Sequence, residues 1–277
     1  MKPIYIFSIL ALAWWVEASA SAGIFNTNII VNGDAEAGAG STNGDTLVAI
    51  PGWIPTGGFN VDAFSPASDT IPAGIPGPPN PGTNFFAGGP TNTLSSASQA
   101  IDVSSGATLI DAGVVRAELT DWLGGYDGQD DNAVLTATCL SASSATLGQF
   151  SLGPVLSVDR GGLTSFLFRA ATNPVPSGTR QIKLLLTMTR QSGSYNDGYA
   201  DNLSLVLRGS PTLQITRLTR SAVLSWPNNY PGFQLQTTTN LSTQWSLATN
   251  SIFVNGVSFV TTNQLGLSSQ FFRLFSP

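Results

Sequence analysis

The sequence predicts an all-β protein, a jelly-roll β-sandwich followed by a small immunoglobulin-like or fibronectin-like β-sandwich. Short strand candidates are separated by clusters of Gly, Pro, Asn and Ser, and no segment has the pattern of a long amphipathic helix. About ten such strands in the larger, first part of the chain favour a sandwich, and a jelly roll in particular. The strands are recognised because apolar residues recur with a period of two, most clearly at Ile182, Leu184, Leu186 and Met188 and at Leu203, Leu205 and Leu207.

The first 22 residues are expected to be a secretory signal peptide. Lys2 gives a basic start, residues 4–16 form an apolar run, and small residues at 18–22 offer a cleavage site. An uncleaved membrane anchor is the alternative, but a run of about 13 residues is short of the ~20 that a spanning helix needs. No other segment approaches that length. The sequence therefore predicts a protein that is secreted or held at the cell surface, with no membrane span in the mature chain.

The mature chain divides by charge. Residues 23–208 hold seven basic and fifteen acidic residues, a net charge of −8, whereas residues 209–277 hold three arginines and no acid. The change falls at Gly209-Ser210-Pro211, a connector of the kind that separates domains. We therefore expect a jelly roll over residues 23–208 and a small C-terminal sandwich over residues 209–277.

The first part contains further strand candidates besides those in the two leucine-rich runs. They are residues 28–31, 59–64, 98–103, 114–123, 133–141, 147–152 and 164–170. Residues 65–93 are rich in Pro and Gly, which predicts a stiff loop rather than a linker because Phe85 and Phe86 give it apolar groups to bury.

The last 69 residues predict a second all-β unit. Its strand candidates are residues 222–226, 233–236, 245–247, 258–261 and 271–274, and a turn is expected at residues 228–232. This is the size of a small immunoglobulin-like sandwich. Its core is expected to contain Trp226, Phe233, Trp245 and Phe272.

The composition excludes several kinds of site. The chain has no histidine, so it has no histidine-based catalytic triad and no histidine metal ligand. Its single cysteine, Cys139, allows no internal disulfide and lies on the same strand face as Leu135 and Ala137, which predicts a buried thiol. The net charge of −5 argues against nucleic acid as a partner, because phosphate binding needs clustered Lys and Arg.

Two segments carry a resemblance to a known superfamily. Residues 29–36 (IIVNGDAE), followed by Pro51-Gly52-Trp53, and residues 197–205 (DGYADNLSL) resemble the first and last strands of galactose-binding-domain-like jelly rolls. Many carbohydrate-binding modules belong to this superfamily. The tail, with residues 225–227 (SWP), 232–236 (GFQLQ) and 271–274 (FFRL), resembles β-sandwich modules that end many secreted bacterial proteins.

The resemblance implies a structural Ca²⁺ where the first and last strands meet. The matching positions are Glu36 and Asp201, with Asp34 and Asn202 as possible additions. Ca²⁺ binds six to eight oxygens from carboxylates, carbonyls and water, which suits a chain without histidine. The alternative is that residues 32–34 only form a turn and that Asp201 pairs with an arginine.

Two glycine-rich loops suggest a sugar site. Residues 122–132 (WLGGYDGQDDN) and residues 192–198 (SGSYNDG) each lie just beyond a strand. If the topology brings the loops to one edge, aromatic faces would lie beside planar polar groups. The alternative is two ordinary solvated loops, in which Gly, Asn and Asp form the turns. The residues expected to contact a ligand are Tyr126, Asp127, Gln129, Tyr195, Asn196 and Asp197.

Trp53 is also a candidate ligand-binding residue because it follows a Pro-Gly turn and precedes Pro55. Its ring is suited to stacking on a sugar, but a tryptophan that covers one end of the core is the favoured interpretation.

The sequence favours an exported, non-catalytic module that recognises a glycan or glycoconjugate and contains a structural calcium. The alternative is a cell-surface or extracellular-matrix structural or adhesion protein that uses its sandwiches for protein contacts. A carboxylate-based glycoside hydrolase has little support, since no two of Glu36, Glu118, Asp121, Asp127, Asp130 and Asp131 are singled out by spacing.

Overall fold

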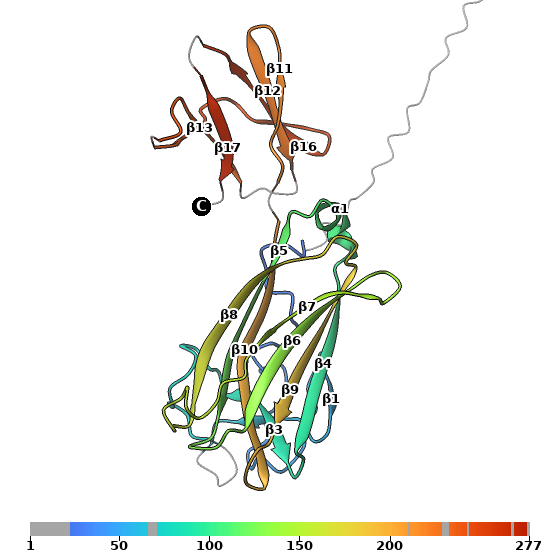
Figure 1. Ribbon diagram of the computed structural model, residues 1–277, viewed down its shortest axis with the longest axis vertical. Helices are drawn as coiled ribbons and strands as arrows, with labels where there is room; N and C mark the ends of the chain where they lie inside the picture. Colours follow the sequence, from blue (N-terminus) through green and yellow to red (C-terminus); the bar gives the residue numbers. More distant parts are fainter. Residues whose placement is uncertain are drawn as a thin grey trace, which may run out of the picture.

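The computed structural model describes residues 23–65, 71–209, 211–228, 233–242, 244–266 and 269–275 (Figure 1). The expected signal peptide, residues 1–22, lies outside them. Within these ranges the chain is almost all β-structure, with one short 3-10 turn (Ser104–Gly106) and one short helix, α1 (Ala107–Asp111). No helix in the described part is long and apolar enough to cross a membrane.

Two five-stranded antiparallel sheets make up the first part of the chain. Sheet I has the strand order β1-β4-β9-β6-β7, and sheet II has the order β2-β3-β10-β5-β8. The bounds are β1 (Ile54–Thr56), β2 (Asn60–Ala63), β3 (Asn84–Pro90), β4 (Leu94–Asp102), β5 (Val115–Gly125), β6 (Asn132–Leu140), β7 (Thr146–Leu152), β8 (Ser165–Pro174), β9 (Gln181–Thr189) and β10 (Tyr195–Gly209).

The pairing of these strands is that of a jelly roll. β3 pairs with β10, β4 with β9, β5 with β8 and β6 with β7, as in one long hairpin folded over on itself. The predicted jelly roll is therefore confirmed. Figure 1 shows β4, β9, β6 and β7 forming one layer and β10, β5 and β8 the other.

The core lies between the two sheets and follows the alternation in the sequence. In β9, Ile182, Leu184, Leu186 and Met188 are all fully buried, while Leu185 points outward and is 36% exposed. Cys139 is a buried free thiol, as expected. One continuous apolar cluster contains inward-facing residues of both sheets, so burial of these side chains stabilises the sandwich.

Two expectations about the first part of the chain need correction. The strand expected at residues 28–31 is not formed, and this segment makes one isolated bridge to β10, between Asn28 and Val206. The reason is the Asn28 side chain, whose Oδ1 accepts hydrogen bonds from the Ile30 and Leu205 amides in place of a backbone ladder. The loop expected over residues 65–93 contains the strand β3, whereas the expected burial of Phe85 and Phe86 is confirmed, since both are 0% exposed.

The tail forms a four-stranded sheet, β11-β12-β16-β15, and a three-stranded sheet, β14-β13-β17. One apolar cluster takes residues from both sheets, among them Leu224 of β12 and Leu235 of β13, so the tail is a small β-sandwich. Each of the four sheets uses strands from one side of residues 209–211 only, while the domain boundary itself stays a prediction. The bounds are β11 (Gln214–Arg217), β12 (Ser221–Pro227), β13 (Gln234–Thr238), β14 (Ser246–Leu247), β15 (Phe253–Asn255), β16 (Ser258–Gln264) and β17 (Phe271–Phe275).

The core of the tail contains Trp226 and Phe272 as expected. Trp245 differs from the expectation: its ring is half-buried and lies 4.4 Å from the Arg273 guanidinium carbon, in a cation–π contact. Phe233 is half-buried.

Candidate functional site

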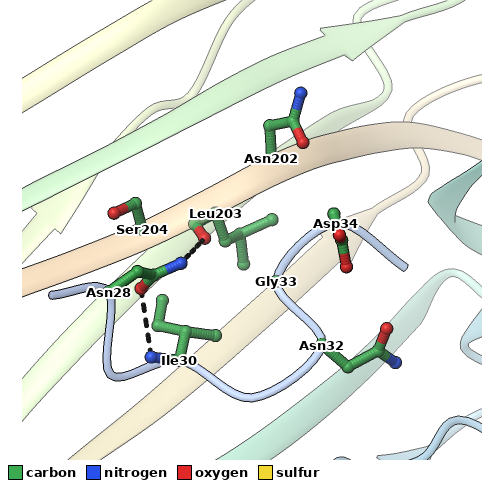
Figure 2. A pocket seen from close by; sticks show the side chains of 8 residues that line it. All are labelled: Asn28, Ile30, Asn32, Gly33, Asp34, Asn202, Leu203 and Ser204. Carbon is green, nitrogen blue, oxygen red and sulfur yellow. Dashed lines mark hydrogen bonds between the residues drawn. The ribbon is translucent and has the colours of Figure 1, made fainter. Parts of the chain in front are cut away.

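The turn at residues 32–34 lies against β10 in the first candidate site. Gly33 accepts a hydrogen bond from the Leu203 amide at 2.8 Å. A Cβ at Gly33 would lie 2.2 Å from the Leu203 carbonyl oxygen, so only glycine allows this approach. Figure 2 shows the turn opposite β10. A pocket of about 300 Å³ lies at this contact and is lined by Asn28, Ile30, Asn32, Gly33, Asp34, Asn202, Leu203 and Ser204.

Asp201 is the most unusual of the predicted calcium ligands. It is fully buried; its Oδ1 accepts a hydrogen bond from the Asn202 amide at 2.7 Å, and its Oδ2 has no partner in the described residues. Burial, with a smaller contribution from the charges of Glu36 and Asp34, raises the pKa of Asp201 to about 8, against the lowering effect of its hydrogen bond from the Asn202 amide. A buried carboxylate with a free oxygen needs either a proton or a cation.

The other three predicted ligands lie around Asp201 and are partly used by the fold. Glu36 accepts hydrogen bonds from the Thr83 amide, the Thr83 hydroxyl and the Asn84 amide at 2.7–2.8 Å. Asp34 accepts a weak bond from the Glu36 amide at 3.4 Å, as in the turn alternative. Asn202 has a left-handed backbone (φ 54°) and its Nδ2 donates to the Asn80 carbonyl.

The alternative to calcium holds for the turn at residues 32–34 but not for Asp201. Asp201 forms no ion pair with an arginine in the described part of the chain, where the ion pairs are Arg169–Asp159, Arg180–Asp111 and Arg208–Glu118. In the same residues, no three Asp, Glu or Cys side chains lie close enough to hold a metal ion by themselves. A cation at Asp201 would therefore need carbonyl oxygens or water as well, which Ca²⁺ accepts.

The burial of Asp121 was not predicted from the sequence. This residue of β5 is fully buried, and neither carboxylate oxygen has a hydrogen-bond partner among the described residues. Its neighbour Trp122 is paired with Asp201. Burial, and then the charge of Asp201, raise the pKa of Asp121 well above its ordinary value. The alternation along β5 indicates this burial, because Asp121 lies on the same inward face of the strand as Leu119 and Leu123.

The two glycine-rich loops come together at one edge of the jelly roll. Asp131 is fully buried and accepts hydrogen bonds from the amides of Gln191, Ser192 and Asp197, at 2.6–3.0 Å. These bonds join the loop after β5 to the loop between β9 and β10. The condition for a sugar site at this edge, convergence of the two loops, is met.

Arg160 fixes the first loop and was not predicted. It lies in the turn between β7 and β8 and is 4% exposed. Its Nη1 donates to the carbonyls of Gly125, Asp127 and Leu163, and its Nη2 donates to the Gln129 carbonyl at 2.7 Å. A single guanidinium therefore holds four carbonyl groups of two loops.

The predicted ligand-contacting residues at this edge fall into two groups. Tyr126 is 43% exposed, Asp127 is exposed and Gln129 is half-buried, so these three side chains are open to a ligand. The other three are engaged within the protein: the Tyr195 hydroxyl with Asp62, Asp197 with the Tyr199 hydroxyl, and Asn196 with the Met188 carbonyl.

Trp53 lies in the core. It is 6% exposed, its Nε1 donates to the Asn32 carbonyl, and its ring packs edge-on against Phe86 at 5.6 Å. The ring is therefore not open to a sugar, and the structure places Trp53 where the favoured interpretation put it.

Comparison with known proteins gives matches to solved structures only. No protein family and no curated protein matches the sequence. A family 16 carbohydrate-binding module is 18% identical with a TM-score of 0.40, covering 65% of this chain and 99% of that one. The CBM22-1 xylan-binding domain from Paenibacillus barcinonensis is 13% identical with a TM-score of 0.34, covering 63% and 99%. The active domain of a bacteriophage CBA120 tailspike protein is 13% identical with a TM-score of 0.39, covering 66% of this chain and 21% of that one.

Proposed function

We propose that this protein is an exported, non-catalytic module whose jelly roll binds carbohydrate. The observation that carries the proposal is the loop edge at residues 125–131 and 191–198, where an exposed aromatic ring stands on a loop fixed by internal hydrogen bonds. Tyr126 offers the ring, and Asp127 and Gln129 offer planar polar groups beside it. This combination suits a ligand that has both apolar C–H faces and hydroxyl groups.

The loop edge is organised before any ligand arrives. Arg160 holds the carbonyls on one side and Asp131 holds the amides on the other. A rigid site loses little conformational entropy on binding, which favours affinity. Asp130 is held by the Ser157 amide and hydroxyl, which lower its pKa. Asp130 and Asp131 accept hydrogen bonds that fix the loops. We therefore infer that these carboxylates position the site and that the protein binds its ligand without catalysing a reaction.

A glycan array tests the proposal. We expect the mature wild-type protein to bind a defined set of glycans and Tyr126→Ala to lose most of that signal, because the aromatic contact is removed. Phe253→Ala is the matched control: this phenylalanine of the tail is 53% exposed, and its loss should leave binding unchanged. Uniform absence of binding by a folded wild-type protein would sink the proposal.

Calcium is the second part of the proposal. The free Oδ2 of buried Asp201, with Glu36, Asp34 and Asn202 around it, fits a hard cation that accepts carboxylate, amide and carbonyl oxygens. A bound Ca²⁺ would neutralise the buried carboxylate and join the 32–36 turn to β10. We expect calcium to raise the melting temperature relative to EDTA, and Asp201→Asn to abolish that difference. An equal rise in wild type and variant would place the ion elsewhere.

A second candidate function, adhesion through protein contacts, is favoured by one observation. The edge strand β15 and the turn after it expose apolar side chains, with Phe253 53%, Val254 61% and Val257 81% exposed. Such a surface is typical of a protein contact. If Phe253→Ala weakened attachment to cells or matrix while the array stayed negative, this candidate would replace carbohydrate binding.

A further inference from the structure

The geometry points to a second carbohydrate-contacting surface, on the outer face of sheet II, that takes a neutral polysaccharide chain. It is centred on Trp122 and Phe168 and continues through Thr120, Ala170 and Ser204 toward the pocket at the 32–34 turn. The inference rests on the proposed function and adds to it the site and the class of glycan.

An exposed aromatic pair is the first observation. Trp122 and Phe168 are directly opposed on β5 and β8, with ring centroids 5.5 Å apart and planes inclined at 55°. Phe168 is 50% exposed and Trp122 is half-buried. The pair thus presents aromatic surface to solvent on a rigid sheet, where a sugar ring can stack without ordering a loop.

The row of side chains beside the pair is small and polar. Ser204, Thr120 and Ala170 are in register on β10, β5 and β8. Among the described residues, the hydroxyls of Thr120 and Ser204 make no hydrogen bond, so both are available to sugar hydroxyls. Ser204 also lines the 300 Å³ pocket with Asn202 and Asp34, and Figure 2 shows Asn202 and Ser204 on the same strand opposite the turn.

The dimensions of the surface indicate a chain rather than a single sugar. Neighbouring strands lie about 4.8 Å apart, so the row from β8 across β5 to β10 spans about 10 Å before it reaches the pocket. A ligand that stacks on Phe168 and reaches Asn202 is therefore an oligosaccharide running across the strands.

The charges on this face favour a neutral ligand. Glu118 and Arg208, the charged pair next along the strands, form an ion pair at 2.8 Å. The pocket end carries the carboxylate of Asp34. Arg116 is also exposed on this face of β5, in register with Arg208, but it lies six residues from Trp122, which is about 20 Å along the strand. These arginines therefore lie away from the aromatic pair, and the carboxylate at the pocket end disfavours an anionic polysaccharide.

The surface is separate from the loop edge. Tyr126 lies four residues beyond Trp122, which is about 13 Å along the chain direction. Between them, Phe166 and Tyr199 are buried in a cluster with Ile71. Substitutions at the two sites can therefore be read independently.

Affinity gel electrophoresis of the mature protein tests the inference, with xylan, galactomannan and hydroxyethylcellulose as neutral probes and alginate as the anionic probe. We expect Phe168→Ala to weaken binding to the retarding neutral polysaccharide by roughly three- to tenfold, the range of one aromatic contact. Phe168→Tyr, which keeps the ring, should bind as wild type does. Leu94→Ala, which removes a 60% exposed aliphatic side chain from β4 of the other sheet, is the control for loss of apolar surface.

The outcomes separate the two sites. If Phe168→Ala binds as wild type does while Tyr126→Ala is impaired, this inference is wrong and the proposed function stands. If no polysaccharide retards the wild-type protein, this inference fails, and the glycan array decides the proposed function. Alginate binding that is lost in Phe168→Ala would overturn the neutral ligand class. A melting curve equal to that of wild type shows that Phe168→Ala is folded.

Discussion

At the residue scale, Asp62 shows how a buried acid can be recognised from its donors and acceptors. The Tyr195 hydroxyl lies 2.7 Å from Asp62 Oδ2 and 3.0 Å from the Gly44 carbonyl oxygen, but it has one proton to donate. The two acceptors therefore compete for one proton while Asp62 is ionised, and a protonated Asp62 would remove this competition because it could donate to the Tyr195 oxygen. Burial raises its pKa from 3.8 to about 7, against the lowering effect of its hydrogen bonds from Tyr195 and Asn60.

This gives a pH dependence with a definite sign. The folded protein holds the Asp62 proton more tightly than the unfolded chain does. The contribution of Asp62 to the free energy of unfolding is therefore greatest below about pH 4 and falls as the pH rises toward 7. Chemical denaturation in EDTA should show that Asp62→Asn flattens the dependence of the free energy of unfolding on pH between about pH 4 and pH 7. Asp201, with a pKa raised to about 8, should still produce a decline up to pH 8. An unchanged slope in Asp62→Asn would contradict a protonated Asp62.

At the element scale, close packing of the 32–34 turn on β10 fixes the pocket and the proposed calcium ligands. Gly33→Ala would place a methyl group 2.2 Å from the Leu203 carbonyl oxygen and push the turn away from the strand. We expect a lower melting temperature and a smaller calcium-dependent rise. Gly128→Ala is the control, because nothing lies within 4 Å of its Cβ position. Equal effects of both variants would show that the contact is unimportant.

The loop edge is a second element whose order depends on one side chain. Arg160→Lys leaves one ammonium where four carbonyls need donors, and a buried carbonyl without a partner costs about 1–3 kcal/mol. We expect faster amide exchange in residues 125–131 and weaker glycan binding with the same Tyr126 present. Arg169→Lys, at a half-exposed ion pair of 3.9 Å, should have little effect. Unchanged exchange in Arg160→Lys would remove Arg160 as a positioning residue.

At the scale of the whole molecule, the four sheets suggest two cooperative units. The apolar clusters of the first part and of the tail contain no residue in common, which favours separate unfolding transitions. Leu224→Ala, in the tail core, should lower the free energy of unfolding of the tail by about 2–5 kcal/mol. In calorimetry, one transition should then move to a lower temperature and the other should stay in place. A single transition that shifts as a whole would contradict the division at residues 209–211.

Local patterns in the sequence predict the strands and the jelly roll, because alternation decides which face is buried. They could not predict which segments that are distant in the sequence contact one another. Convergence of the two loops depends on strand register, Arg160 reaches the loop from a turn about 30 residues away, and the Asn28 side chain replaces a strand that its apolar neighbours favoured. These are long-range contacts, which no local pattern encodes.

The most direct test of the central claim, that the jelly roll binds carbohydrate, is isothermal titration of the mature protein with xylan, galactomannan and hydroxyethylcellulose. The account predicts saturable binding to at least one of them, weakened by Tyr126→Ala and unchanged by Phe253→Ala. Absence of binding to all three and to the glycan array, by protein shown to be folded, would contradict it.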